Sequence, residues 1–241
     1  MGLFSLFDPI QILNKRIEKF SSSKHCPDEL RQFYKKIPVT KDTPIKQCQI
    51  TSIDFETTGL DIENDQILSI GGIDITRSAI QFNSTFHYYI KNKEDVIKKE
   101  SAVINQITPE LLANGKDISI AIYELLEKIS GKIILVHCSY IECGFIRKIL
   151  KLRKKDPLPF LVLDTMEIER KLNMANPNID VRLSSIRERR NLPEYEAHNA
   201  LIDSLATAEV FLAQIKDVFK NTQATILPIY KRSLYCLKEK G

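Results

Sequence analysis

Two acidic residues separated by a single position follow a short apolar run in residues 48–60 (CQITSIDFETTGL). The β-branched residues before them predict a strand, and the Thr-Thr-Gly after them predicts a turn. Because side chains alternate along a strand, Asp54 and Glu56 should leave the same face of the sheet. Two carboxylates held side by side repel each other unless a proton or a cation lies between them, and a divalent metal ion is the natural occupant. The alternative is a pair of solvated acids at the edge of a strand.

Two further acids lie near the expected starts of helices. Glu142 follows a short buried strand expected over residues 132–137 (KIILVH) and begins a helix expected over residues 140–152. The helix dipole alone can explain an acid there, since it favours one by about 0.3 to 1 kcal/mol. Asp164 precedes a helix expected over residues 165–172 and is interpreted as the cap of that helix rather than as a metal ligand.

A histidine and an acid lie across the start of a helix expected over residues 199–215, whose apolar residues repeat with helical spacing. His198 and Asp203 are five positions apart. This spacing lets the histidine lean over the first turn of the helix while the aspartate projects further along it. The alternative for His198 is a structural hydrogen bond at the helix start.

Composition sets broad limits on the protein. The chain has 241 residues, of which 43% are hydrophobic, and this is enough for one ordinary domain with an extension. Its net charge of +4 permits a polyanionic partner without requiring one. The five cysteines lack zinc-site and Cys-x-x-Cys spacing, which indicates reduced thiols and a cytoplasmic protein. No segment reaches the roughly 18 apolar residues that a membrane span needs, and the start lacks the pattern of a secretion signal.

The order of the expected elements predicts an α/β fold. An N-terminal segment with helical spacing at residues 8–20 and 27–36 precedes three antiparallel strands, the second and third of which lie at residues 65–75 and 79–90. After these, strands alternate with helices, so we expect a mixed sheet covered by helices. The expected division of the chain is a helical extension at 1–45, a main domain at 46–216 and a C-terminal tail at 217–241.

Three motifs give the chain a family resemblance. These are D-x-E-T-T-G-L at residues 54–60, the strand-to-helix step H-x-S-x-x-E at 137–142, and H-N-A-L-I-D at 198–203. In order and spacing they resemble the motifs of the DEDDh exonucleases over about residues 46–216. The resemblance implies a ribonuclease-H-like fold, two Mg²⁺ or Mn²⁺ ions, and removal of nucleotides from a 3′ end of single-stranded DNA in proofreading or repair. RNA or short oligonucleotides are the alternative substrates, because no sequence motif reports how a 2′-hydroxyl is sensed.

The resemblance also implies a role for each candidate residue. Asp54 would bridge both metals, Glu56 and Asp203 would hold the metal on the side of the nucleophile, and Glu142 would serve the second metal. His198 would be the general base, a task that suits a side chain whose pKa lies near neutral pH. Carboxylate oxygens suit Mg²⁺ or Mn²⁺ better than zinc.

Substrate contacts are implied in the same way. The backbone around Thr57 and Thr58 would contact the terminal nucleotide, and Leu60 would wedge beside its base. The basic segments at residues 147–155 (RKILKLRKK) and 187–190 (RERR) either follow the phosphate backbone or are solvated helix faces.

The sequence departs from the family pattern in two stretches. In the second motif, Glu142 stands where the family has aspartate, and the usual His-Asn pair is His137-Cys138. In the other stretch, Asn105 replaces the usual histidine of I-H-G-I-T. These departures leave a rival hypothesis, a domain of exonuclease fold that binds nucleic acid or a DNA polymerase with weak or no cleavage. Because the four acids and His198 all remain, we favour the enzyme. Residues 223–229 (QATILPI) resemble a sliding-clamp peptide with one residue too many, which makes a clamp a further candidate partner.

Overall fold

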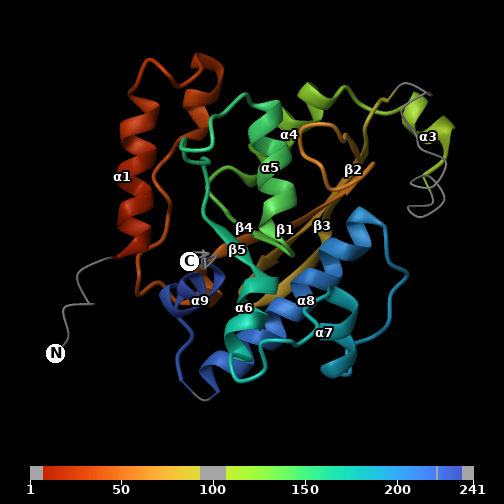
Figure 1. The fold of residues 1–241 in the computed structure, drawn as a ribbon. Helices are drawn as coiled ribbons and strands as arrows, with labels where there is room; N and C mark the ends of the chain where they lie inside the picture. The colour runs from red at the N-terminus through yellow and green to blue at the C-terminus, as the bar shows by residue number, and fades with distance from the viewer. Residues whose placement is uncertain (1–7, 93–106, 221, 235–241) are drawn as a thin grey trace.

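A five-stranded mixed sheet forms the centre of the protein (Figure 1). The computed structural model describes residues 8–92, 107–220 and 222–234. The strands lie in the order β3-β2-β1-β4-β5, with β1 antiparallel to β2 and parallel to β4. Their bounds are β1 Gln49–Thr57, β2 Ile67–Thr76, β3 Ala79–Tyr89, β4 Ile133–Val136 and β5 Val162–Asp164. The expected α/β architecture is confirmed.

Helices cover both faces of this sheet. The α-helices are α1 Pro9–Ser21, α3 Pro109–Ala113, α4 Ile118–Ile129, α5 Ser139–Ile149, α6 Thr165–Leu172, α7 Leu183–Arg189, α8 Ala200–Phe219 and α9 Ile226–Ser233, and short 3₁₀ helices span Asp28–Phe33 (η2) and Ile45–Gln47 (η3). Helix α8 packs against β1, β2 and β3 on one face (Figure 1). Helix α4 lies on the other face, where Lys128 reaches over the ring of Phe86. No helix in the described part of the chain has the length and apolar character to cross a membrane.

Strand β1 is the central strand, and it presents the first two acids. It is hydrogen-bonded to β2 on one side and to β4 on the other, so its apolar side chains are buried. In the ladder with β2, Asp54 lies opposite Gly71 and Glu56 lies opposite Ser69. Directly paired residues point to the same face, and this face is the one that α8 covers.

The N-terminal and C-terminal segments share the core of the sheet domain. Ile10 and Ile17 of α1 and Ile226 and Ile229 of α9 belong to the same cluster of buried residues as the strands. Because Ile226 and Ile229 are buried, the clamp-like segment at residues 223–229 presents little apolar surface to a partner. A sliding clamp as partner stays a prediction. The division of the chain at residues 45 and 216 stays a prediction.

Several element bounds differ from the sequence predictions. The second helix of the extension is a 3₁₀ helix at Asp28–Phe33 instead of an α-helix over 27–36. Helix α8 continues to Phe219, which is itself a buried residue of the helix. The 217–241 segment contains α9, whose Ser233 hydroxyl accepts a hydrogen bond from the backbone N–H of Asp164 at 2.7 Å. Asn105 and Cys236 lie outside the described residues; the other four cysteines are free thiols.

Candidate active site

Three carboxylates from two distant segments meet at the end of β1. Asp54 and Glu56 project from the strand, and Asp203 projects from the first turn of α8. One oxygen from each lies within 4.8 Å of the others. Asp54 and Asp203 are half-buried, and Glu56 is 7% exposed. The strand period and the packing of α8 together place three acids where one cation could contact all of them.

The electrostatics of this acid trio favour a bound cation. Burial raises the pKa of Asp54 well above its ordinary value, and the charges of Glu142, Asp203 and Glu56 raise it further. Burial and the neighbouring Asp203 raise the pKa of Glu56 to about 7. Burial also raises the pKa of Asp203. Like charges in a poorly hydrated site must be neutralised by protons or by a cation, and hard carboxylate oxygens suit Mg²⁺ or Mn²⁺.

Glu142 lies beside the trio without being one of its close members. It is in the first turn of α5 and is 3% exposed. Its Oε2 atom is buried and has no hydrogen-bond partner among the described residues. Burial raises its pKa, with added contributions from Asp164 and Glu56. A simple helix-start acid would be solvated, so this buried oxygen indicates a cation or a ligand group as its missing partner.

The turn that positions Glu142 depends on Asp164. Cys138, the residue before α5, has a left-handed φ of 78°. The backbone N–H groups of Cys138 and Ser139 donate to the Asp164 carboxylate at 3.2 and 2.7 Å. The same carboxylate accepts from Met166 N–H at 2.9 Å at the start of α6. The capping role predicted for Asp164 is confirmed, and its second role at α5 was not visible in the sequence.

His198 lies in the loop before α8, on the open side of the acids. Its backbone N–H donates to Asp203 Oδ2 at 2.9 Å, and its φ is 68°. Its side chain is exposed, and its ring has no hydrogen-bond partner in the described part of the chain. With Asp54 and Asp203 it lines a cavity of about 780 Å³ that α7 also borders. The helix-start hydrogen bond is therefore made by the backbone, which leaves the imidazole available to the cavity.

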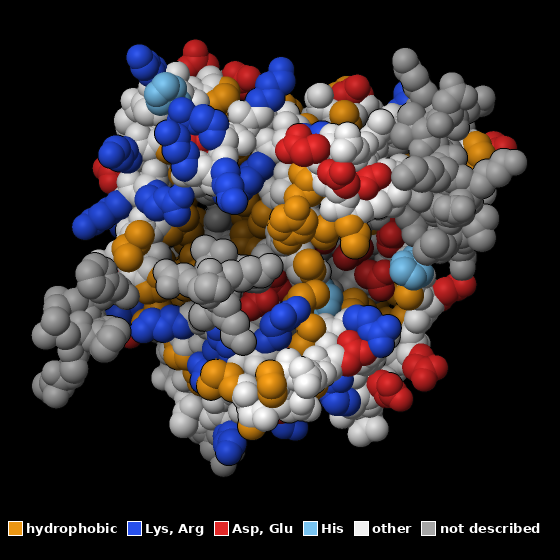
Figure 2. Space-filling model, viewed as in Figure 1, with side chains coloured by type: hydrophobic (Ala, Val, Ile, Leu, Met, Phe, Trp, Pro, Cys, Tyr) orange, Lys and Arg blue, Asp and Glu red, His pale blue; other side chains and the backbone are white. Residues whose placement is uncertain are grey.

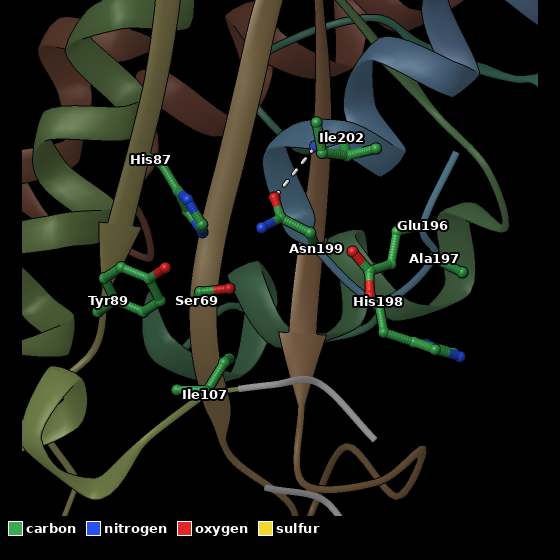
Figure 3. A pocket seen from close by; sticks show the side chains of 9 residues that line it. All are labelled: Ser69, His87, Tyr89, Ile107, Glu196, Ala197, His198, Asn199 and Ile202. Carbon is green, nitrogen blue, oxygen red and sulfur yellow. Dashed lines mark hydrogen bonds between the residues drawn. The ribbon is translucent and has the colours of Figure 1, made fainter. Parts of the chain in front are cut away.

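A smaller polar pocket lies next to the acids and was not predicted (Figure 3). It has a volume of about 130 Å³ between β2, β3 and the loop before α8, and Figure 3 shows the His198 ring turned away from it. Ser69 Oγ and His87 Nε2 are buried there without hydrogen-bond partners among the described residues. Burial lowers the pKa of His87, which favours a neutral ring. The sequence carries no signal for this pocket, because its residues meet only through strand register and through the packing of the loop before α8 against the sheet.

The turn after β1 holds the three predicted substrate-contact residues. Thr57 Oγ1 donates to the carbonyl of Gly59 at 2.7 Å, and Thr58 Oγ1 donates to Asp65 Oδ1 at 2.8 Å. Leu60 is 73% exposed. Hydrogen bonds within the turn thus hold its shape, and the turn presents one apolar side chain to solvent four residues after Glu56. The substrate roles of Thr57, Thr58 and Leu60 stay predictions.

The arginines of the basic segment at 187–190 form ion pairs with acids of other helices. Arg187 is buried and pairs with Glu209 at 2.8 Å. Arg189 and Arg190 both pair with the buried Glu169, at 3.4 and 2.8 Å. These arginines join α7 to α6 and α8, so their main role in this structure is to hold the helices together.

Comparisons with known proteins agree with this geometry. The profile of a family described as exonuclease (RNase_T) matches residues 51–211. A DNA polymerase III PolC-type of Thermotoga petrophila is 31% identical over 176 residues, which cover 71% of this chain and 12% of that protein. A DNA polymerase III subunit epsilon of Treponema pallidum is 27% identical over 167 residues, 68% of this chain and 75% of that protein. The chain thus spans only about an eighth of the PolC-type relatives.

Solved structures share the fold. The nuclease domain of 3'hExo, a DEDDh family member bound to rAMP, superposes with a TM-score of 0.61 at 15% identity, covering 73% of this chain and 95% of that one. Exonuclease I of E. coli in complex with a dT13 oligonucleotide superposes with a TM-score of 0.59 at 16% identity, covering 70% and 41%.

Proposed function

The chain belongs to the RNase_T exonuclease family, and on this basis we propose that it is a metal-dependent 3′-to-5′ exonuclease acting on single-stranded DNA ends. The observation that carries the proposal is the meeting of Asp54, Glu56 and Asp203 within 4.8 Å, next to a buried carboxylate oxygen of Glu142 that lacks a partner. Four acids whose pKa values are all raised are costly to keep together without a cation.

The donor set fits two divalent ions, Mg²⁺ or Mn²⁺. Asp54 is central among the acids and would contact both ions, Glu56 and Asp203 would hold one, and Glu142 would serve the other. When bound, such ions supply a nucleophilic water near neutral pH and stabilise the attacking and leaving oxygens of the phosphodiester.

His198 would accept the proton of the attacking water on a ring nitrogen. Its exposed ring lies in the same cavity as Asp54 and Asp203, and the N–H bond to Asp203 anchors the loop that carries it. A neutral imidazole can take up a proton near pH 7, as a general base must. The backbone at Thr57 and Thr58 would hold the terminal nucleotide, and the exposed Leu60 would pack beside its base.

Two other functions remain as alternatives. An exonuclease for RNA or short oligonucleotides would use the same acids, and the unpartnered Ser69 and His87 groups provide polar atoms near the site that a ribose hydroxyl could use. A binding module with weak cleavage would follow if Glu142 positions its metal poorly. The names of the relatives favour a DNA polymerase as partner, and a role in proofreading would follow from the motif resemblance.

The test uses purified protein with 5′-labelled and 3′-labelled single-stranded DNA and RNA in Mg²⁺, Mn²⁺ or EDTA. We expect progressive shortening of the 5′-labelled DNA, early release of the 3′ label as mononucleotide, and no reaction in EDTA. An Asp54→Asn variant controls for contaminating nucleases. Shortening of RNA alone would establish the first alternative, and binding without metal-dependent shortening would establish the second.

A further inference from the structure

Exposed lysine and arginine side chains gather over α1 and the segments packed against it (Figure 2). They come from three parts of the chain, namely α1, the segment after η2 and the segment after α5. We call this set the basic surface; it consists of Lys15, Arg16, Lys19, Lys35, Lys36, Lys151, Lys154 and Lys155, all of which are exposed.

Hydrogen bonds hold the three segments together. Arg16 Nη2 of α1 donates to the carbonyl of Lys155 at 2.9 Å. Asn14 Oδ1 of α1 accepts from Ile37 N–H at 2.7 Å. Tyr34 OH donates to the carbonyl of Pro157 at 2.9 Å from a buried position. The basic surface is therefore a fixed feature of the fold, although its side chains are long.

The charged groups of the basic surface form no salt bridges within the described part of the chain. The ion pairs of the described residues use none of its eight members, whereas the neighbouring acids Asp28 and Asp156 pair with Arg31 and Arg153. Like charges at Lys15 and Lys19, four positions apart on one helix, also disfavour the isolated helix. This contrasts with Arg187, Arg189 and Arg190, which are taken up by Glu209 and Glu169.

Helix α5 connects the basic surface to the acids. Its first turn carries Glu142, and Lys151 follows its last turn. Seven residues of helical rise, about 10 Å, lead from Glu142 to Ile149 at the end of α5, and two further residues lead to Lys151. The basic surface therefore begins about four nucleotides away from the acids, for a stacked strand at ~3.4 Å per nucleotide. Between them, Lys148 Nζ donates to the carbonyls of Glu63 and Asp65 at 2.8 and 3.0 Å, in the loop that follows Leu60. These bonds join the loop that follows Leu60 to the last turn of α5.

We propose that the basic surface binds the phosphate backbone of the substrate strand several nucleotides upstream of the 3′ end held at the acids. This inference rests on the proposed function for the identity of the strand. It assigns a role to the N-terminal extension, which would act together with the segment after α5 to retain long strands. Short oligonucleotides would occupy the acids without reaching the basic surface.

The test compares two triple variants with the same change in charge. Lys151→Gln/Lys154→Gln/Lys155→Gln removes one part of the basic surface. Lys41→Gln/Lys46→Gln/Lys220→Gln removes three exposed lysines elsewhere, of which Lys46 precedes β1 at the end opposite the acids. Binding of fluorescein-labelled dT20 and dT4 is followed by anisotropy in EDTA, so that the measurement does not depend on cleavage.

We expect the first variant to bind dT20 about tenfold more weakly at 50 mM salt, with a log–log salt slope reduced by about 2, because each lost phosphate contact removes ~0.7 on a single strand. Its affinity for dT4 and both affinities of the control variant should match the parent. Equal loss for dT4 and dT20, or no loss for either, would overturn the proposal. The proposal would also be overturned if the first variant bound dT20 as tightly as the parent but lost binding to phosphatidylserine vesicles. The basic surface would then bind a membrane. A parent that binds dT20 in this manner yet fails to cleave it would refute only the proposed function.

Discussion

Gly71 of β2 lies directly against the backbone of Ala200, the first residue of α8. A Cβ atom at residue 71 would overlap the backbone of Ala200 and Leu201. Because Gly71 is also the ladder partner of Asp54, this close approach sets the start of α8 beside the first acid. Asp203 then lies one helical turn away, within reach of Asp54 and Glu56.

We therefore predict that Gly71→Ala lowers kcat/KM by about 10²-fold, because shifts near 1 Å in an active site cost that much. The matched variant is Gly72→Ala, whose Cβ would meet the far end of the Phe86 side chain on the opposite face of the sheet. It should lower thermal stability with little loss of activity. Equal activity in the two variants would show that the approach of α8 does not position Asp203.

The pKa of Glu56 leads to a prediction for the metal-free protein. Its pKa rises from 4.5 in the unfolded chain to about 7 in the fold. The folded state therefore binds this proton more tightly than the unfolded chain does. The resulting contribution to the free energy of unfolding is complete below pH 4.5 and is lost as the pH rises through 7. In EDTA, the free energy of unfolding measured with urea should fall between pH 4.5 and 7. Glu56→Gln should make the fall in the free energy of unfolding smaller. Mg²⁺ should also make it smaller, because the ion neutralises the ionised acids. A free energy that rises with pH over this range would contradict the site electrostatics.

Replacing His198 by alanine should lower turnover by about 10² to 10⁴, the usual range for a general base. Metal affinity, measured by calorimetry with Mn²⁺, should change little, because only the backbone of His198 contacts Asp203. His87→Ala is the comparison, since it removes a nearby imidazole that does not line the larger cavity. A large loss of Mn²⁺ affinity on His198→Ala would instead make His198 a ligand.

Glu142 differs from its family counterpart by one methylene group. We predict that Glu142→Gln impairs cleavage strongly, and that Glu142→Asp leaves activity unchanged or lower, because the shorter side chain withdraws the buried oxygen from the acids. Single-turnover rates at saturating Mn²⁺ measure both. If Glu142→Asp proves many-fold faster than the parent, the natural protein is a weakened enzyme, and the binding-module alternative gains support. If Glu142→Gln cleaves as fast as the parent, Glu142 is only an acid at the start of a helix and has no part in the site.

Local patterns in the sequence determined the elements and the residues that each presents. Alternation along β1 placed Asp54 and Glu56 on one face, and the apolar stripe of the last long helix predicted α8 with Asp203 near its start. The cap at Asp164 could be predicted for the same reason, because a capping side chain bonds to backbone two or three residues away. These features depend on neighbours in the sequence.

Tertiary structure decided which of these residues meet and which are occupied elsewhere. The second cap of Asp164 at α5 and the ion pairs of Arg187 join residues distant in sequence. The basic surface likewise depends on contacts between distant segments, such as the hydrogen bond from Arg16 to Lys155, 139 positions along the chain. A single sequence carries no periodic signal for such contacts, since they depend on how the helices pack against the sheet.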